Sequence, residues 1–161
     1  MKAFIVDGSK RSFADVILEN KTTGKTCSVA SWGFGAAQVR RLIREFQRVL
    51  LVADASHSQL NASAYAAVLR MQKTYAHFTF RPCKTHVKLA LIDDEIIIFT
   101  SANLSANKRA ESYIVGELSE IDGIDQIKEF IGEPEKIFRV DDGFFDLGKE
   151  LQFNILTFGD A

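Results

Sequence analysis

Two pairs of polar residues have the spacing of neighbours on one face of a β-strand. His86 and Lys88 stand two residues apart, and so do Ser101 and Asn103. The chain between the pairs consists of two apolar segments separated by acidic residues, which is typical of two buried strands joined by a tight turn. Because residues two apart on a strand share a face, pairing of these strands would gather an imidazole, an ammonium, a hydroxyl and an amide.

This set of side chains suits attack on a phosphodiester. Lys88 and the donors of Ser101 and Asn103 can bind phosphate oxygens, and His86 can attack phosphorus or transfer protons. The carboxylate of Glu111 can hold the imidazole in one tautomer. Taken singly, each residue has an ordinary structural interpretation, as a strand histidine, a solvated lysine, or a capping or loop residue. The joint spacing favours a phosphate site.

The same residues resemble a known family signature. H-V-K-L-A-L-I-D, from His86 to Asp93, and T-S-A-N, from Thr100 to Asn103, resemble the H-x-K-x4-D and G-S-x-N elements of the phospholipase D superfamily. Thr100 stands where the family often has glycine, a residue that permits close backbone approach. The order of the elements is compatible with the family over about residues 25–132.

The resemblance implies an α/β fold, with a mixed β-sheet flanked by helices, and a phosphodiesterase that needs no metal and no cofactor. Two motifs combine in the family to form one active site, in which one histidine forms a phosphohistidine and the other protonates the leaving group. This chain has a single motif. The resemblance therefore implies a homodimer with the active site at the two-fold axis, where a symmetric dimer places the same patch of both subunits.

The resemblance also assigns roles to residues of this chain. It implies that His86 is the nucleophile or acid and base, and that Lys88 binds phosphate together with Ser101 and Asn103. Glu111 is expected to orient His86. The remaining catalytic-motif residue, Asp93, is expected to have a structural role rather than to touch the substrate.

Periodicity along the chain predicts an α/β domain in which strands and helices alternate. The sequence has 161 residues, 47% hydrophobic and 25% charged, which suits one domain. We expect a single domain over 1–161, with its core at about 25–132 and an acidic, Phe-rich extension at 133–161. Strands are predicted at 2–6, 26–30, 49–53, 77–81, 89–92, 96–99 and 112–118, and helices at 12–18, 36–48, 60–75 and 121–131.

Three loops are expected at the site, because ligands of such sheets lie beyond the carboxyl ends of the strands. They are 31–35, 54–58 and 103–110. Trp32 in the first loop is either a stacking surface for a base or lipid head group, or a core aromatic. His57 in the second is either a further polar group of the site or an exposed loop histidine.

Charge is unevenly distributed, and its distribution bears on the substrate. Residues 36–110 carry a net charge of +6, whereas 111–161 carry −9. A basic half around a phosphate site favours nucleic acid, although a pI near 6.3 is not that of a dedicated nucleic-acid binder. The leading hypothesis is a nuclease acting on DNA or RNA. The alternatives are a phospholipase D-type lipid phosphodiesterase and a catalytically weak nucleic-acid-binding module of the same fold.

Several classes of protein are disfavoured by what the sequence lacks. No window approaches the eighteen or more apolar residues of a membrane span, and the apolar run before Asp7 is too short for a signal peptide. We therefore expect a cytoplasmic protein without stable membrane association. The three histidines are scattered, and neither Cys27 nor Cys83 has metal-ligand spacing, so no metal site is expected and both cysteines are expected to be buried thiols.

Overall fold

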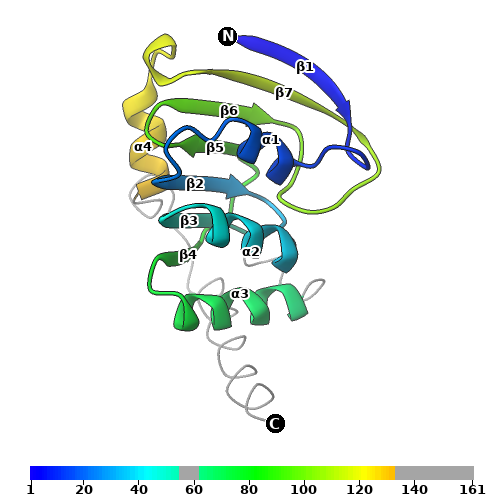
Figure 1. Ribbon diagram of the computed structural model, residues 1–161, viewed down its shortest axis with the longest axis vertical. Coiled ribbons are helices and arrows are strands. Elements are labelled where there is room, and N and C mark those ends of the chain that lie inside the picture. Colours follow the sequence, from blue (N-terminus) through cyan, green and yellow to red (C-terminus); the bar gives the residue numbers. More distant parts are fainter. Residues whose placement is uncertain (55–61, 133–161) are drawn as a thin grey trace.

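The computed structural model of the protein describes residues 1–54 and 62–132, which form a seven-stranded sheet with helices on both faces (Figure 1). The strand order is β1-β7-β6-β5-β2-β3-β4. The strands are β1 (Lys2–Asp7), β2 (Thr26–Ser31), β3 (Arg48–Ala53), β4 (Phe78–Pro82), β5 (Leu89–Ile92), β6 (Ile96–Thr100) and β7 (Ala110–Glu117). The predicted α/β class with a mixed sheet is confirmed.

The sheet has a parallel half and an antiparallel half. β2 pairs in parallel with β3, and β3 with β4, whereas β2 pairs antiparallel with β5. β5, β6, β7 and β1 continue the sheet as antiparallel neighbours. One end of the sheet therefore collects the carboxyl ends of β2, β3, β4 and β6 and the amino ends of β5 and β7.

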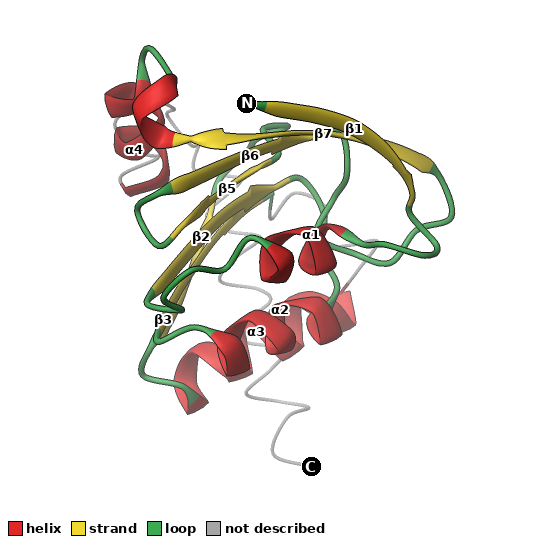
Figure 2. Cartoon of the chain, turned by 45° about the horizontal axis from the view of Figure 1, so that its top comes forward, coloured by secondary structure: helices red, strands yellow, loops and turns green. Residues whose placement is uncertain are grey.

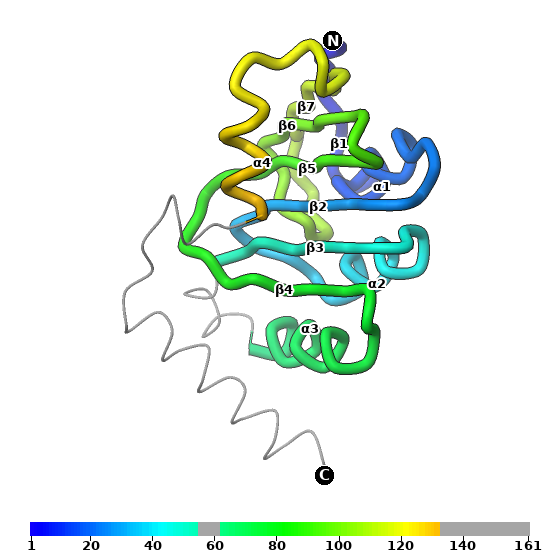
Figure 3. The backbone as a smooth tube through the Cα atoms, turned by 90° about the vertical axis from the view of Figure 1, so that its left-hand side faces the viewer, coloured from blue at the N-terminus to red at the C-terminus, as the bar shows by residue number. Residues whose placement is uncertain are grey.

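The helices cover the two faces unequally. Three of them lie on one face, namely α1 (Phe13–Glu19), α2 (Ala36–Glu45) and α3 (Ala62–Thr74), and α4 (Ile124–Gly132) lies on the other (Figures 2 and 3). The larger core fills the first face, where Val39, Leu42 and Ile43 of α2 are buried. A smaller cluster, which includes Leu89 and Ile131, lies beneath α4.

The element boundaries differ from the predicted ones where strand pairing or a turn ends the helical periodicity. α1 begins after Ser12, whose hydroxyl caps the helix by accepting a hydrogen bond from the Asp15 amide. α2 ends at Glu45 instead of 48, because Phe46 is already extended and Arg48 pairs with Thr26 as the first residue of β3. α4 begins at 124 instead of 121, preceded by a 3-10 turn (Leu118–Glu120) and by Gly123, whose φ is 79°.

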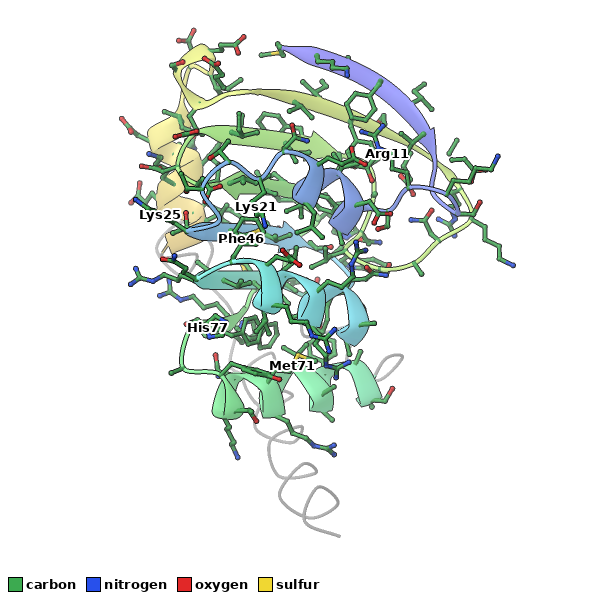
Figure 4. The ribbon with its side chains drawn as sticks, in the orientation of Figure 1. Arg11, Lys21, Lys25, Phe46, Met71 and His77 are labelled. Atoms are coloured by element: carbon green, nitrogen blue, oxygen red, sulfur yellow. The ribbon has the colours of Figure 1, made fainter. Side chains whose placement is uncertain are left out.

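The end of the sheet remote from the motif contains His77, which precedes β4. Its Nε2 atom lies 2.9 Å from the carbonyl oxygen of Ile43, and its ring meets the edge of Tyr75. Figure 4 labels His77 together with Phe46 and Met71, both of which are buried. His77 is therefore a structural histidine, distant from His86.

Candidate active site

His86 and Lys88 immediately precede β5 instead of lying within it. The strand covers Leu89–Ile92, as predicted, so the argument that His86 and Lys88 share a face of a strand does not apply to them. Lys88 is nevertheless aligned with β6, because its carbonyl oxygen accepts from the Thr100 amide at 3.2 Å. His86 is exposed, and the Lys88 ammonium lies 3.5 Å from the His86 carbonyl oxygen. The two side chains are thus held at the amino end of β5 with access to solvent.

Trp32, in the loop after β2, stacks on His86. The ring centroids are 5.7 Å apart and the planes differ by 23°. Trp32 is half-buried, so it is neither a fully enclosed core aromatic nor a separate surface group. The stack brings the loop at 31–35 to the motif, as the argument from strand ends predicted.

Asn103 is tied to the same loop through its side-chain oxygen. The Gly33 amide donates to Asn103 Oδ1 at 3.1 Å, and the Ser31 hydroxyl lies 3.5 Å from that atom. The Leu104 amide in turn donates to the Ser31 hydroxyl at 3.0 Å. Because a backbone N–H needs an acceptor, the Asn103 oxygen faces the loop and its NH₂ group points the other way. That group is a donor suited to an anionic oxygen.

Ser101 and Glu111 form a hydrogen-bonded pair. The Ser101 hydroxyl donates to Glu111 Oε2 and accepts from the Ser112 amide at 3.0 Å. Glu111 is buried, with 8% of its surface exposed. We expected Glu111 to orient His86 and Ser101 to donate to a phosphate. The hydrogen bond instead joins these two residues to each other, so the Ser101 proton already has an acceptor.

Thr100, the last residue of β6, stands where the family signature often has glycine and begins the corner that leads to Ser101. Its hydroxyl donates to the Ser112 carbonyl oxygen and accepts from the Ala102 amide, both at 2.9 Å. Among the described non-glycine residues, positive φ occurs only at Asp93 and Asp94. The corner therefore needs no glycine conformation, and the threonine hydroxyl fastens the turn that carries Ser101.

Asp93 lies at the opposite end of β5, roughly 16 Å along an extended chain from Lys88. Its two oxygens accept six hydrogen bonds from residues 22–26, five from backbone amides and one from the Thr22 hydroxyl. Burial acts to raise the pKa of Asp93, but hydrogen bonds from Gly24, Thr22 and Thr26 outweigh it and hold the pKa well below its ordinary value. Asp93 organises the turn before β2.

The structure thus brings together six of the residues singled out in the sequence, including Glu111 through its hydrogen bond with Ser101, and separates one from them. Trp32 contacts His86, Lys88 is aligned with the residue before Ser101, and Asn103 is fastened to the loop that carries Trp32. Asp93 is the separated residue. His57 and the extension at 133–161 lie outside the described residues.

Two residues of the segment 31–35, which was expected at the site, were not themselves singled out, namely Ser31 at the end of β2 and Gly33 after it. Both hold Asn103, and Ser31 is completely buried. The sequence signal that could have indicated them is the S-W-G run at the end of a predicted strand. A small polar residue and a glycine at that place favour a tight loop whose side chains and amides hydrogen-bond nearby residues.

Two further findings concern ligands and membranes. Within residues 1–54 and 62–132, no three His, Cys, Asp or Glu side chains form a group that could hold a metal ion. In the same part of the chain, no helix is both long and apolar enough to span a lipid bilayer. Cys27 and Cys83 are buried, as expected.

Comparison with known proteins supports the fold. No family model and no curated protein sequence matches this chain. Among solved structures, NucT from Helicobacter pylori is similar with a TM-score of 0.63 and 17% identity over 82% of this chain and 92% of its own. Nuc from Salmonella typhimurium, a phospholipase D family member, is similar with a TM-score of 0.54 and 14% identity, over 71% of this chain and 81% of its own.

A third similar structure is that of TrmBL2, an archaeal chromatin protein with a novel mode of DNA binding. It has a TM-score of 0.53 and 16% identity, and the match covers 86% of this chain but 53% of TrmBL2. At identities this low, the likeness establishes the shared fold. The predicted phospholipase D-like fold is therefore confirmed.

Proposed function

We propose that the protein is a metal-independent phosphodiesterase that hydrolyses DNA or RNA through a phosphohistidine and acts as a homodimer. The observation that carries this proposal is the alignment of Lys88 with Thr100. It sets His86 and Lys88, which precede β5, beside the turn with Ser101 and Asn103 after β6. A nucleophile, a cation and a neutral donor then surround one point that solvent can reach.

The reaction proceeds in two displacements. An imidazole nitrogen of His86 attacks phosphorus, so that a P–N bond forms while the bond to the leaving oxygen breaks, and a second acid protonates that oxygen. The acid, now a base, takes a proton from water, whose oxygen attacks phosphorus and releases the imidazole. One imidazole cannot be nucleophile and acid in the same step. A second copy of the chain would supply the other His86 across a two-fold axis.

The remaining residues act on the phosphate and on each other. The Lys88 ammonium and the Asn103 NH₂ group neutralise and bind the non-bridging oxygens. Ser101 acts in the resting site as the donor that holds the buried Glu111 carboxylate. Trp32 limits the orientation of the His86 ring through their stack.

Nucleic acid is the substrate class that best fits the charge. The half of the chain that contains the motif has a net charge of +6, which suits a polyanion. TrmBL2, which shares the fold, binds DNA. Its likeness also favours a second candidate function, nucleic-acid binding without efficient turnover.

The test is cleavage of plasmid and single-stranded DNA in EDTA by the wild type, His86→Ala and His77→Ala. We expect His86→Ala to lower the rate by about a hundredfold or more, because it removes the nucleophile. His77 is the matched control, since it is a histidine remote from the site. Undiminished cleavage by His86→Ala would refute the mechanism. DNA binding without cleavage would support the second candidate, and hydrolysis of phosphatidylcholine vesicles alone would indicate a lipid substrate.

Mixing of subunits tests the dimer. With a ninefold excess of His86→Ala chains and free subunit exchange, random pairing leaves about a tenth of wild-type chains with a wild-type partner. Activity per wild-type chain should fall in proportion. Activity that stays constant on mixing would show that each subunit works alone.

A further inference from the structure

A groove of about 390 Å³ lies beside His86, between the segment that precedes β5 and helix α4. Its walls include Val87 and Leu89 on one side and Ile127 and Phe130 on the other. His86 itself lines the groove, so the cavity opens directly onto the proposed nucleophile. The mechanism described above makes no use of this space.

The groove is apolar at its base and polar at its rim. Leu89 is 4% exposed and belongs to the cluster beneath α4, against which Ile127 and Phe130 pack while remaining half-buried. Gln126 and Lys84 line the groove and are exposed. An apolar cavity with a few polar groups at its edge is the general character of a site for a small organic group.

We propose that this groove binds the nucleobase of the nucleotide adjoining the phosphate that His86 attacks. The inference rests on the proposed function. A base offers flat apolar faces, which suit Ile127 and Phe130, and a polar edge, which suits the Gln126 amide. Lys84 at the rim complements the next phosphate of the chain. An acyl chain would fill the same apolar walls but has no polar edge to pair with the Gln126 amide.

The first experiment removes the base from the substrate. A labelled single-stranded oligonucleotide is made with one tetrahydrofuran abasic residue at each position in turn, so that no base pairing competes with the groove. The wild type should cleave about tenfold more slowly at the phosphate adjoining the abasic residue, because base–aromatic contacts contribute at that level. Cleavage at distant phosphates should be unchanged.

The second experiment removes the groove's aromatic wall. Phe130→Leu should slow cleavage of the intact oligonucleotide about tenfold and should abolish the penalty for the abasic residue, since base and ring act as a pair. Ile124→Ala, on the same helix but outside the groove, is the matched control. Gln126→Ala, at an exposed position, should alter the preference among the four bases and leave the thermal unfolding temperature unchanged.

The outcomes separate the inference from the function on which it rests. Two results would overturn the groove assignment alone. In the first, cleavage depends on His86 but is equally fast at phosphates adjoining an abasic residue and an intact one. In the second, Phe130→Leu still cleaves about tenfold more slowly at the phosphate adjoining the abasic residue. Loss of vesicle hydrolysis in Phe130→Leu with unchanged oligonucleotide cleavage would also overturn it, in favour of an acyl chain. Fluorescence anisotropy can measure the affinity of His86→Ala for the same oligonucleotides without turnover. Equal affinities for the intact and the abasic strands would refute the inference.

Discussion

The indole of Trp32 stacks on the imidazole of His86, with ring centroids 5.7 Å apart and planes inclined by 23°. The two residues come from neighbouring strands, since Trp32 follows β2 and His86 precedes β5, which pair antiparallel. The His86 side chain is exposed, and among the described residues its imidazole has no other ring contact or hydrogen bond. The stack is therefore the contact that restrains it. Trp32 is therefore a positioning residue for His86.

Replacement of Trp32 should lower turnover more than substrate affinity. Trp32→Leu removes the ring that restrains His86, and we expect kcat to fall about tenfold with a smaller change in KM, because misorientation of a reacting group acts on the chemical step. Trp32→Phe should retain most of the activity. Steady-state kinetics on an oligonucleotide measures both constants. A change confined to KM would indicate that Trp32 binds substrate instead.

Trp32 also provides a spectroscopic signal for this contact. It is the only tryptophan in the chain, so the intrinsic tryptophan fluorescence comes from this one residue. Because the indole stacks on the imidazole, His86→Ala should change the emission spectrum of Trp32, whereas His77→Ala should leave it unchanged. Identical emission spectra for the wild type and His86→Ala would contradict the stack.

The Ser101–Glu111 pair should contribute to both stability and activity. Ser101→Ala leaves a buried carboxylate without its hydroxyl donor, and we expect a loss of about 1–3 kcal/mol in the free energy of unfolding. Glu111→Gln can still accept from the hydroxyl and should cost less. Chemical denaturation of the single and double variants gives their coupling energy. Strictly additive losses would mean that the two residues do not interact in solution.

The hydroxyl of Thr100 should be needed for the shape of the corner. Thr100→Val keeps the branched side chain but loses the hydrogen bonds with Ser112 and Ala102, which should cost about 1–2 kcal/mol. The rate of cleavage should fall as well, because the same turn carries Ser101 and Asn103. Denaturation and kinetics on one preparation measure both effects. An unchanged free energy of unfolding would show that the hydroxyl contacts are dispensable.

Asp93 should dominate the acid sensitivity of the fold. Its pKa is lowered on folding, so its contribution is complete above about pH 4, the ordinary value for an aspartate, and is lost as the pH falls toward the depressed folded value. Asp93→Asn should cost on the order of 3 kcal/mol at pH 7, because its NH₂ group would face amide donors. The loss should shrink below pH 4.

Urea denaturation of the wild type and Asp93→Asn across pH 3 to 7 checks this prediction. Asp94→Asn is the matched control, since Asp94 is the adjacent aspartate and its side chain is 75% exposed in a salt bridge with Lys128. A constant difference between wild type and Asp93→Asn over the whole range would contradict the proposed linkage.

Much of the fold was predictable because its signals are local. The apolar runs of β5 and β6 and the acidic turn between them specified a hairpin, and the helix predicted at 12–18 differs from α1 by one residue at each end. The predicted helix ends were less accurate. At Phe46 the backbone becomes extended, and Arg48 then pairs with Thr26. That pairing is a long-range contact which no local pattern reports.

The sequence alone placed His86 and Lys88 just before one apolar strand and Ser101 and Asn103 just after the next, so that pairing of β5 with β6 brings both pairs to one end of the hairpin. The tertiary structure alone decided that Trp32 stacks on His86 and that Glu111 holds Ser101 instead of His86. The physical reason is that side-chain periodicity reports which face of a strand is buried but not which strands are neighbours. The pairing of β2 with β5 brings Trp32 to His86, and the pairing of β7 with β6 brings Glu111 to Ser101.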